Sequence, residues 1–217
     1  MANLRAAARY RTFCWREGRR IRSALGVSQY VVPMTHDPVA TKVVTDEGEL
    51  DFQDYFVRRA CEPAVKSIRF QGIESAGPSS AVTAALEESD AILIAPSNPF
   101  VSIEPILSLQ GVRRLVASKP ALAVSPIVGG QALKGPAAKM LAELGHEVTP
   151  IAVAEGYADC LGGFVIDSED AMLAHSVERM GFEVLVTQTV MRSDADRIAL
   201  AKACLDLVQS LGPKKAS

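Results

Sequence analysis

The chain has 217 residues, of which 48% are hydrophobic and 22% are charged, an ordinary composition for a globular protein with a substantial core. The formal net charge of −2 gives no electrostatic reason to expect a nucleic acid or an acidic membrane as partner, and no apolar stretch has the length of a membrane span. The four cysteines lie far apart without a CxxC pair, which argues against zinc and disulfides and predicts a reducing, cytoplasmic location.

The N-terminal part predicts one helix and one strand. Residues 1–26 are rich in arginine and favour a separate helix over about 4–25, which Gly26 ends. A strand at 30–32 follows and leads into the polar loop 34–38. Thr35 and Asp37 in this loop either face a ligand or belong to a turn, because Asp-Pro is typical of turns.

Residues from about 40 to 75 predict a small insertion in the main domain. A turn at 46–48 indicates a hairpin, and Asp51 is placed to cap a helix over 52–59. The moderate alternation of 66–73 is typical of an edge strand. The segment 77–80 then begins a helix that runs to about residue 88.

Two apolar runs, at residues 91–95 and 121–124, form the centre of the chain. Each lacks polar alternation and stops at a loop with serine and proline, as in a parallel strand buried on both faces. Because a helical pattern follows each run, they predict a βαβ unit.

The second half continues the alternation of strands and helices. We expect an extended piece at 148–153, buried strands at 164–167 and 183–187, helices at 169–180 and 194–211, and a loose tail at 213–217. The fold class predicted is therefore α/β and Rossmann-like: a mostly parallel sheet with helices on both faces, forming a single domain over 27–212.

Polar groups follow the predicted strands where ligands bind in open α/β sheets. Gly129 and Gly130 precede a helix start, a pattern that favours an anion; equally, it is typical of a loop that needs glycine to turn. The polar groups at the strand ends are Ser97, Asn98, Ser125, Gly129, Gly130, Lys134, Asp167, Thr189 and Arg192.

Several blocks of the sequence resemble the 2-phospho-L-lactate transferase (CofD) family, mainly over residues 52–197. They are MTHDP, APSNPFVSIEPIL, AVSPIVGGQALKGPAAKMLAELG, GFVID and VTQTVMR. The resemblance implies a step in coenzyme F-420 biosynthesis. A phospho-lactyl or phospho-enolpyruvyl group moves from a GDP-activated donor to the deazaflavin alcohol Fo, GMP is released and Mg²⁺ assists. It also implies small-molecule partners and a homodimer.

The resemblance implies roles for the strand-end residues. The loop 125–130, with Ser125, Gly129 and Gly130, would cradle phosphates beside Lys134. Ser97 and Asn98 would hold the nucleotide or its phosphate. Thr35 and Asp37 would be catalytic, with Asp37 near the metal, and Arg192 would neutralise charge.

Two departures from the family pattern leave several hypotheses open. The family begins with a strand and a Gly-Gly-x-Gly-Gly-x-Lys loop that has no counterpart before Tyr30, and His36 stands where the family has an acid, a better Mg²⁺ ligand. We therefore expect the N-terminal segment to be lacking. The chain is then a transferase, with or without a separate chain supplying that segment, a non-catalytic nucleotide- or phosphosugar-binding protein, or an inactive truncated fragment.

Overall fold

The computed structural model describes residues 20, 22–24, 26–133 and 135–214. Most of the predicted N-terminal helix, Lys134 and the end of the predicted tail lie outside these residues. Within them, no helix is both long enough and apolar enough to cross a membrane.

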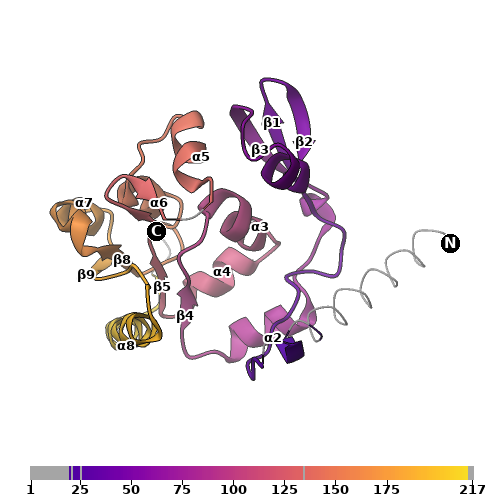
Figure 1. Ribbon diagram of the computed structural model, residues 1–217. Coiled ribbons are helices and arrows are strands. Elements are labelled where there is room, and N and C mark those ends of the chain that lie inside the picture. Colours follow the sequence, from indigo (N-terminus) through magenta and orange to yellow (C-terminus); the bar gives the residue numbers. More distant parts are fainter. Residues whose placement is uncertain (1–19, 21, 25, 134, 215–217) are drawn as a thin grey trace.

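A parallel sheet of four strands forms the centre of the fold (Figure 1). Its order follows the chain: β4 (Ile92–Ile94), β5 (Ala121–Val124), β8 (Gly163–Asp167) and β9 (Glu183–Thr187). Both central strands, β5 and β8, are buried along their whole length. The strands at the edges are not: Leu93 in β4 is 42% exposed, and β9 is only partly covered. The prediction of burial on both faces is thus confirmed for the centre of the sheet and wrong for its edges.

Helices cover both faces of this sheet, as predicted. The segments that connect successive strands contribute Val116, Leu141, Val153 and Val177 to one large core cluster, which includes Phe164 and Ile166 of β8. The helix α8 (Asp194–Ser210) packs on the opposite face through Leu200, Cys204 and Val208. The connecting elements are η3 (Pro99–Ile103), α3 (Glu104–Leu107), α4 (Val112–Ala117), β6 (Ile127–Val128), β7 (Gln131–Ala132), α5 (Ala137–Glu143), α6 (Pro150–Glu155), η4 (Ser168–Leu173) and α7 (Ala174–Glu178).

A separate antiparallel sheet projects from one side of the molecule (Figure 1). Its order is β2 (Gly48–Asp51), β1 (Ala40–Thr45), β3 (Val65–Gln71), so the predicted hairpin and edge strand are confirmed. The helical turn η1 (Asp54–Arg58) follows β2 and buries Tyr55 completely. Asp51 does not cap this turn, because it ends β2 and its carboxylate pairs with Lys42 at 2.5 Å.

The helix α5 joins the two sheets. Its Met140 is fully buried in a cluster with Val43, Tyr55 and Val65 of the antiparallel unit. Lys139 donates to the Pro63 carbonyl at 2.9 Å and to Glu143 at 2.7 Å. From the antiparallel sheet the chain returns through η2 (Ile73–Ser75) and the predicted helix α2 (Ser80–Glu88), which Ser79 caps.

Two predicted extended segments are absent from the structure. Residues 30–32 form no strand, and Tyr30 is 87% exposed. Residues 148–153 mostly belong to the helix α6, because Thr149 accepts from the Ala152 N–H and Pro150 takes the first helical position.

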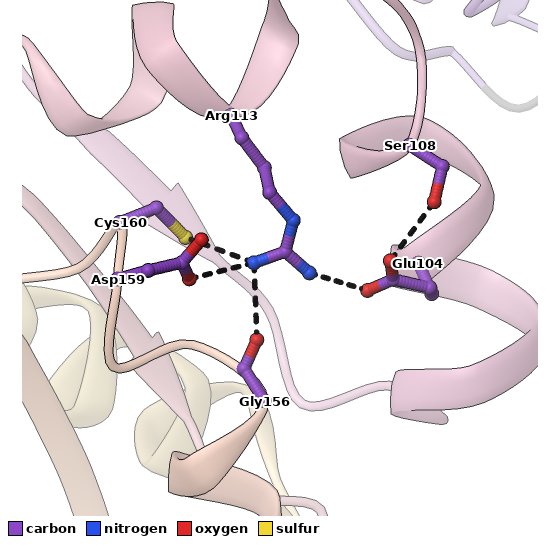
Figure 2. A network of polar contacts seen from close by, with 6 residues as sticks. All are labelled: Glu104, Ser108, Arg113, Gly156, Asp159 and Cys160. Carbon is purple, nitrogen blue, oxygen red and sulfur yellow. Dashed lines mark hydrogen bonds and ion pairs between the residues drawn. The ribbon is translucent and has the colours of Figure 1, made fainter.

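A polar network fastens α3 and α4 to the turn before β8 (Figure 2). Arg113 donates to Glu104 at 2.6 Å, to Asp159 at 2.7 Å and to the Gly156 carbonyl at 3.2 Å. Burial, with Asp159 adding to it, raises the pKa of the neighbouring Cys160 thiol to about 12. The network therefore joins these segments around a buried thiol, whose raised pKa disfavours the reactive thiolate form.

Candidate functional site

A cavity of about 510 Å³ opens at the carboxyl ends of β4, β5 and β9. It therefore lies where open α/β sheets bind ligands. Its lining combines apolar groups with a few hydroxyl and amide groups and one guanidinium. The residues are Pro96, Ser97, Asn98, Ser125, Pro126, Leu133, Ala137, Thr189, Val190, Met191 and Arg197.

The loop after β4 forms one wall of the cavity. The Asn98 side chain caps η3 by accepting the N–H groups of Phe100 at 2.9 Å and Val101 at 3.3 Å, and its amide lies 3.3 Å from the Met140 sulfur. Among the described residues, the Ser97 hydroxyl has no hydrogen-bond partner. Asn98 thus fixes the loop, while Ser97 has its hydroxyl available for a ligand.

Ser125, directly after β5, is a buried turn residue. Its hydroxyl accepts from the Ile127 N–H at 3.1 Å and donates to the Ile127 carbonyl at 3.0 Å. This local pairing directs the chain into the small hairpin of β6 and β7.

The wall after β9 consists of Thr189, Val190 and Met191, and Asp167 holds it. The Asp167 carboxylate accepts from the Thr189 N–H at 2.7 Å and the Thr189 hydroxyl at 2.8 Å. Burial alone would raise the pKa of Asp167. The donors from Glu169, Thr189 and Val190 outweigh it and hold that pKa below its usual value.

Arg197 supplies the guanidinium of the lining, and the sequence analysis did not single it out. Its side chain is 57% exposed and pairs with Asp194 at 2.5 Å. The predicted Arg192 does not line the cavity. A capping box of Ser193 and Asp196 starts α8 directly after Arg192, and Arg197 then lies within the first turns of that helix. The sequence predicted this helix start correctly, but the start alone does not show which arginine lines the cavity.

Gly129 and Gly130 lie outside the cavity lining, in the turn of the β6–β7 hairpin. Both have positive φ, +55° and +73°, as such a turn requires. The Gly129 N–H donates to the Asp170 carboxylate at 3.1 Å, and a Cβ at Gly129 would lie 2.7 Å from the Glu169 carboxylate. Two acidic side chains beside this turn disfavour an anion there, so the turn interpretation explains these glycines better.

Thr35 and Asp37 also lie outside the cavity lining. The Thr35 hydroxyl donates to the Gly77 carbonyl at 2.6 Å and accepts from the Asp37 N–H at 3.1 Å. The Asp37 carboxylate accepts from the Gly77 N–H at 3.2 Å. Both side chains thus fasten the loop 34–38 to the segment before α2.

A magnesium site at Asp37 does not fit this geometry. Its carboxylate is engaged with Gly77, away from the cavity. Within the described ranges, no three His, Cys, Asp or Glu side chains gather in a way that could hold a metal ion.

The parallel sheet and the cavity at its strand ends place the chain in the class of open α/β proteins, in which ligands bind at this edge of the sheet. The model of the family described as 2-phospho-L-lactate transferase CofD matches residues 16–203, and the chain belongs to this family. The resemblance noted in the sequence is thereby confirmed.

Relatives named 2-phospho-L-lactate transferase include those of Methanosarcina mazei, 39% identical, and Methanothermobacter thermautotrophicus, 38% identical, each over 84% of this chain. The chain spans 60% and 58% of the length of these two relatives. The protein from Methanopyrus kandleri is 36% identical over 95% of this chain and 69% of its own length.

The fold is similar to that of a solved structure from Bacillus halodurans, titled a member of the UPF0052 family. The TM-score is 0.56 at 12% identity, with 84% of this chain and 64% of that chain covered. A second structure from the same organism gives a TM-score of 0.58 at 14% identity, over 86% of this chain and 65% of that chain. At such identities the likeness concerns the fold alone.

Proposed function

We propose that the chain takes part in the 2-phospho-L-lactate transferase reaction of its family. In this reaction a phospho-lactyl or phospho-enolpyruvyl group moves from a GDP-activated donor to the alcohol of the deazaflavin Fo, in coenzyme F-420 biosynthesis. Family membership and the names of the relatives support the proposal. The observation that carries it is the strand-end cavity, where the Ser97 hydroxyl and the Arg197 guanidinium meet an apolar lining.

The proposed step is a phosphoryl-type transfer. The alcohol oxygen of Fo attacks the phosphorus that carries the lactyl or enolpyruvyl group, the bond from this phosphorus to the oxygen of GMP breaks, and the alcohol proton is released. Such reactions depend mainly on positioning and on neutralising charge. We assign Arg197 to the donor's phosphates and Ser97 to a hydrogen bond with the same group, while Asn98 and Ser125 fix the loops that shape the cavity.

Magnesium enters the proposal as an ion held by the phosphates of the donor, because Asp37 does not offer a site at the cavity. No step is assigned to a metal bound by the protein itself. A homodimer, and a separate chain that supplies the N-terminal segment of the family, complete the proposal. Both are tested by measuring the mass of the purified particle, alone and with that segment added.

A second candidate function is binding of a nucleotide or phosphosugar without catalysis. It is favoured by the lining of the cavity, which among the described residues consists of hydroxyl, amide, guanidinium and apolar groups without a carboxylate. Such a lining suits binding and offers no base of the common kinds.

Calorimetric titration with GDP and Mg²⁺ tests the site, and the two arginines provide matched variants. We expect Arg197→Gln to weaken GDP binding about tenfold through loss of a charged contact to phosphate, and Arg192→Gln to leave it unchanged. Equal effects of the two variants on the affinity for GDP would contradict the proposal that Arg197 binds the GDP phosphates in this cavity.

Turnover separates the two functions. Incubation with Fo and the GDP-activated donor should release GMP if the chain is a transferase. Binding of GDP without release of GMP would favour the binding protein, and a folded chain without GDP binding would favour the inactive fragment.

A further inference from the structure

Asp167 is a buried acid that no substrate step uses. It is the last residue of β8, a strand buried along its whole length, and is itself only 1% exposed. Isolated charges at such positions are costly, so buried carboxylates persist where several donors satisfy them. Asp167 meets this condition, because three donors surround its two oxygens.

Two of these donors belong to the cavity wall. One carboxylate oxygen accepts both the N–H and the hydroxyl of Thr189, and the N–H of the next residue, Val190, helps to lower the pKa of Asp167. The other oxygen accepts from the Glu169 N–H at 3.0 Å and caps η4. The carboxylate thus joins the start of η4 to the wall of the cavity.

The wall has few other anchors. Residues 188–192 form neither helix nor strand, so no ladder of backbone hydrogen bonds fixes them. Beyond Thr189, the next bond of this segment in the described structure is from the Arg192 N–H to Asp196, at the start of α8. The position of the wall therefore depends on the charged acceptor beneath it, since bonds to an ionised carboxylate are stronger than neutral ones.

We propose that Asp167 is a positioning residue whose carboxylate holds the wall of Thr189, Val190 and Met191 in the shape that binds the donor nucleotide. It acts through the wall and does not contact the ligand. The proposal rests on the proposed function, because it takes this cavity as the nucleotide site.

Asp167→Asn and Asp170→Asn form a matched pair. In Asp167→Asn the side chain keeps its size, but one carboxylate oxygen is replaced by an NH₂ group, which cannot accept a hydrogen bond. The side chain therefore loses its bond either to η4 or to the cavity wall. Asp170 is a similarly buried acid, three residues later, and its one hydrogen bond among the described residues is from the Gly129 N–H of the hairpin turn. General damage near this strand end should affect both variants alike.

Two measurements on the full chain test the proposal. The first is amide hydrogen exchange of Thr189 without ligand, and the second is the dissociation constant of GDP. For Asp167→Asn we expect the exchange rate of the Thr189 amide and the dissociation constant each to rise about tenfold, the effect of losing one charge-assisted bond. Asp170→Asn should change neither.

Thr189→Val and Thr189→Ser keep the test decisive if Asp167→Asn does not fold. Valine removes the hydroxyl bond to Asp167 and serine retains it. We therefore expect faster exchange of the amide of residue 189 and weaker GDP binding with valine than with serine. A hydroxyl that merely contacted the ligand would not change exchange of this amide in the free protein.

The outcomes distinguish a failure of the positioning role of Asp167 from a failure of the proposed function. Unchanged exchange in Asp167→Asn, or faster exchange with unchanged GDP affinity, overturns the positioning role. A wild-type chain that does not bind GDP overturns the proposed function, and the exchange rates then decide alone whether Asp167 holds the wall.

Discussion

At the scale of single residues, Asp167 and Asp170 show how environment separates two similar acids. Both are buried, but Asp167 accepts from three donors and its pKa is lowered. Burial raises the pKa of Asp170, which has one N–H donor from Gly129 and lies near the negative charge of Asp167. The ionised form is thus stabilised by the fold at Asp167 and penalised at Asp170.

The pH dependence of stability should differ in sign between the two positions. The contribution of Asp167 is present above the unfolded pKa, near 4, and is lost as the pH falls through its lower folded pKa. Ionised Asp170 is unfavourable above its raised folded pKa, and this penalty is relieved as the pH falls. At pH 7 we expect Asp167→Asn to lower the free energy of unfolding by about 2 kcal/mol and Asp170→Asn to lower it by no more than about 0.5 kcal/mol.

Urea unfolding between pH 7 and pH 3 checks this prediction. The difference between wild type and Asp167→Asn should shrink below about pH 4. A difference that stays constant over this range would mean that the charge of Asp167 contributes nothing to stability.

At the scale of elements, the contact between β8 and α8 depends on Gly163. A Cβ at this position would lie 2.7 Å from a methyl group of Leu211 and 3.0 Å from the Leu122 Cβ. The Leu211 side chain can shift, but the Cβ of Leu122 in the neighbouring strand is fixed. The absence of a side chain at Gly163 therefore allows the end of α8 to lie close to the sheet.

We expect Gly163→Ala to lower the free energy of unfolding by about 1–3 kcal/mol, since overpacking a filled core has this cost. Gly212→Ala is the control, because a Cβ there meets nothing within 4 Å and the change should stay within about 0.5 kcal/mol. The midpoints of urea unfolding provide the measurement. Similar midpoints for the two variants would show that α8 adjusts without cost.

Helices and strands could be predicted from the sequence where local residues mark their ends. Ser79 before α2 and Ser193 before α8 lie at helix starts that the sequence placed correctly. The prediction of an extended piece at 148–153 was wrong, because a short apolar run does not distinguish a strand from a helix. Thr149 and Pro150 nevertheless carried the signal of a helix start. Burial of edge strands depends on neighbours that are distant in sequence.

At the scale of the whole molecule, Lys139 links the antiparallel unit to the parallel sheet. Its ammonium donates to the Pro63 carbonyl and to Glu143, which in turn accepts the Val65 N–H at 2.9 Å. These bonds supplement the apolar contact made by Met140. Because they cross between the two units, their loss should loosen the antiparallel unit before the rest of the fold.

For Lys139→Met we expect amide exchange in β1 and β3 to rise about tenfold, with exchange in β5 and β8 unchanged, as for local opening of one unit. Lys202→Met, on the exposed side of α8, is the control and should change neither group. Faster exchange in both sheets at once would show that the two units open together.

The candidate site was predictable in its location but not in its full composition. The strand-end rule brought Ser97, Asn98, Ser125 and Thr189 to one cavity. Arg197 was missed although the start of α8 was predicted correctly, because the packing of α8 against the sheet determines which arginine lies at the cavity. The structure places Gly129 in a hairpin turn, where its N–H pairs with Asp170, and residue types alone do not reveal such pairing.

The strand order β4-β5-β8-β9 also has a consequence for how the chain folds during synthesis. Each new parallel strand pairs with the strand that precedes it in the sheet, which has already left the ribosome, and no later segment separates an earlier pair. The entropy lost in closing each loop is thus limited to one crossover at a time. We expect the parallel sheet to grow in the direction of translation, with α8 covering its second face only after the last strand has been made.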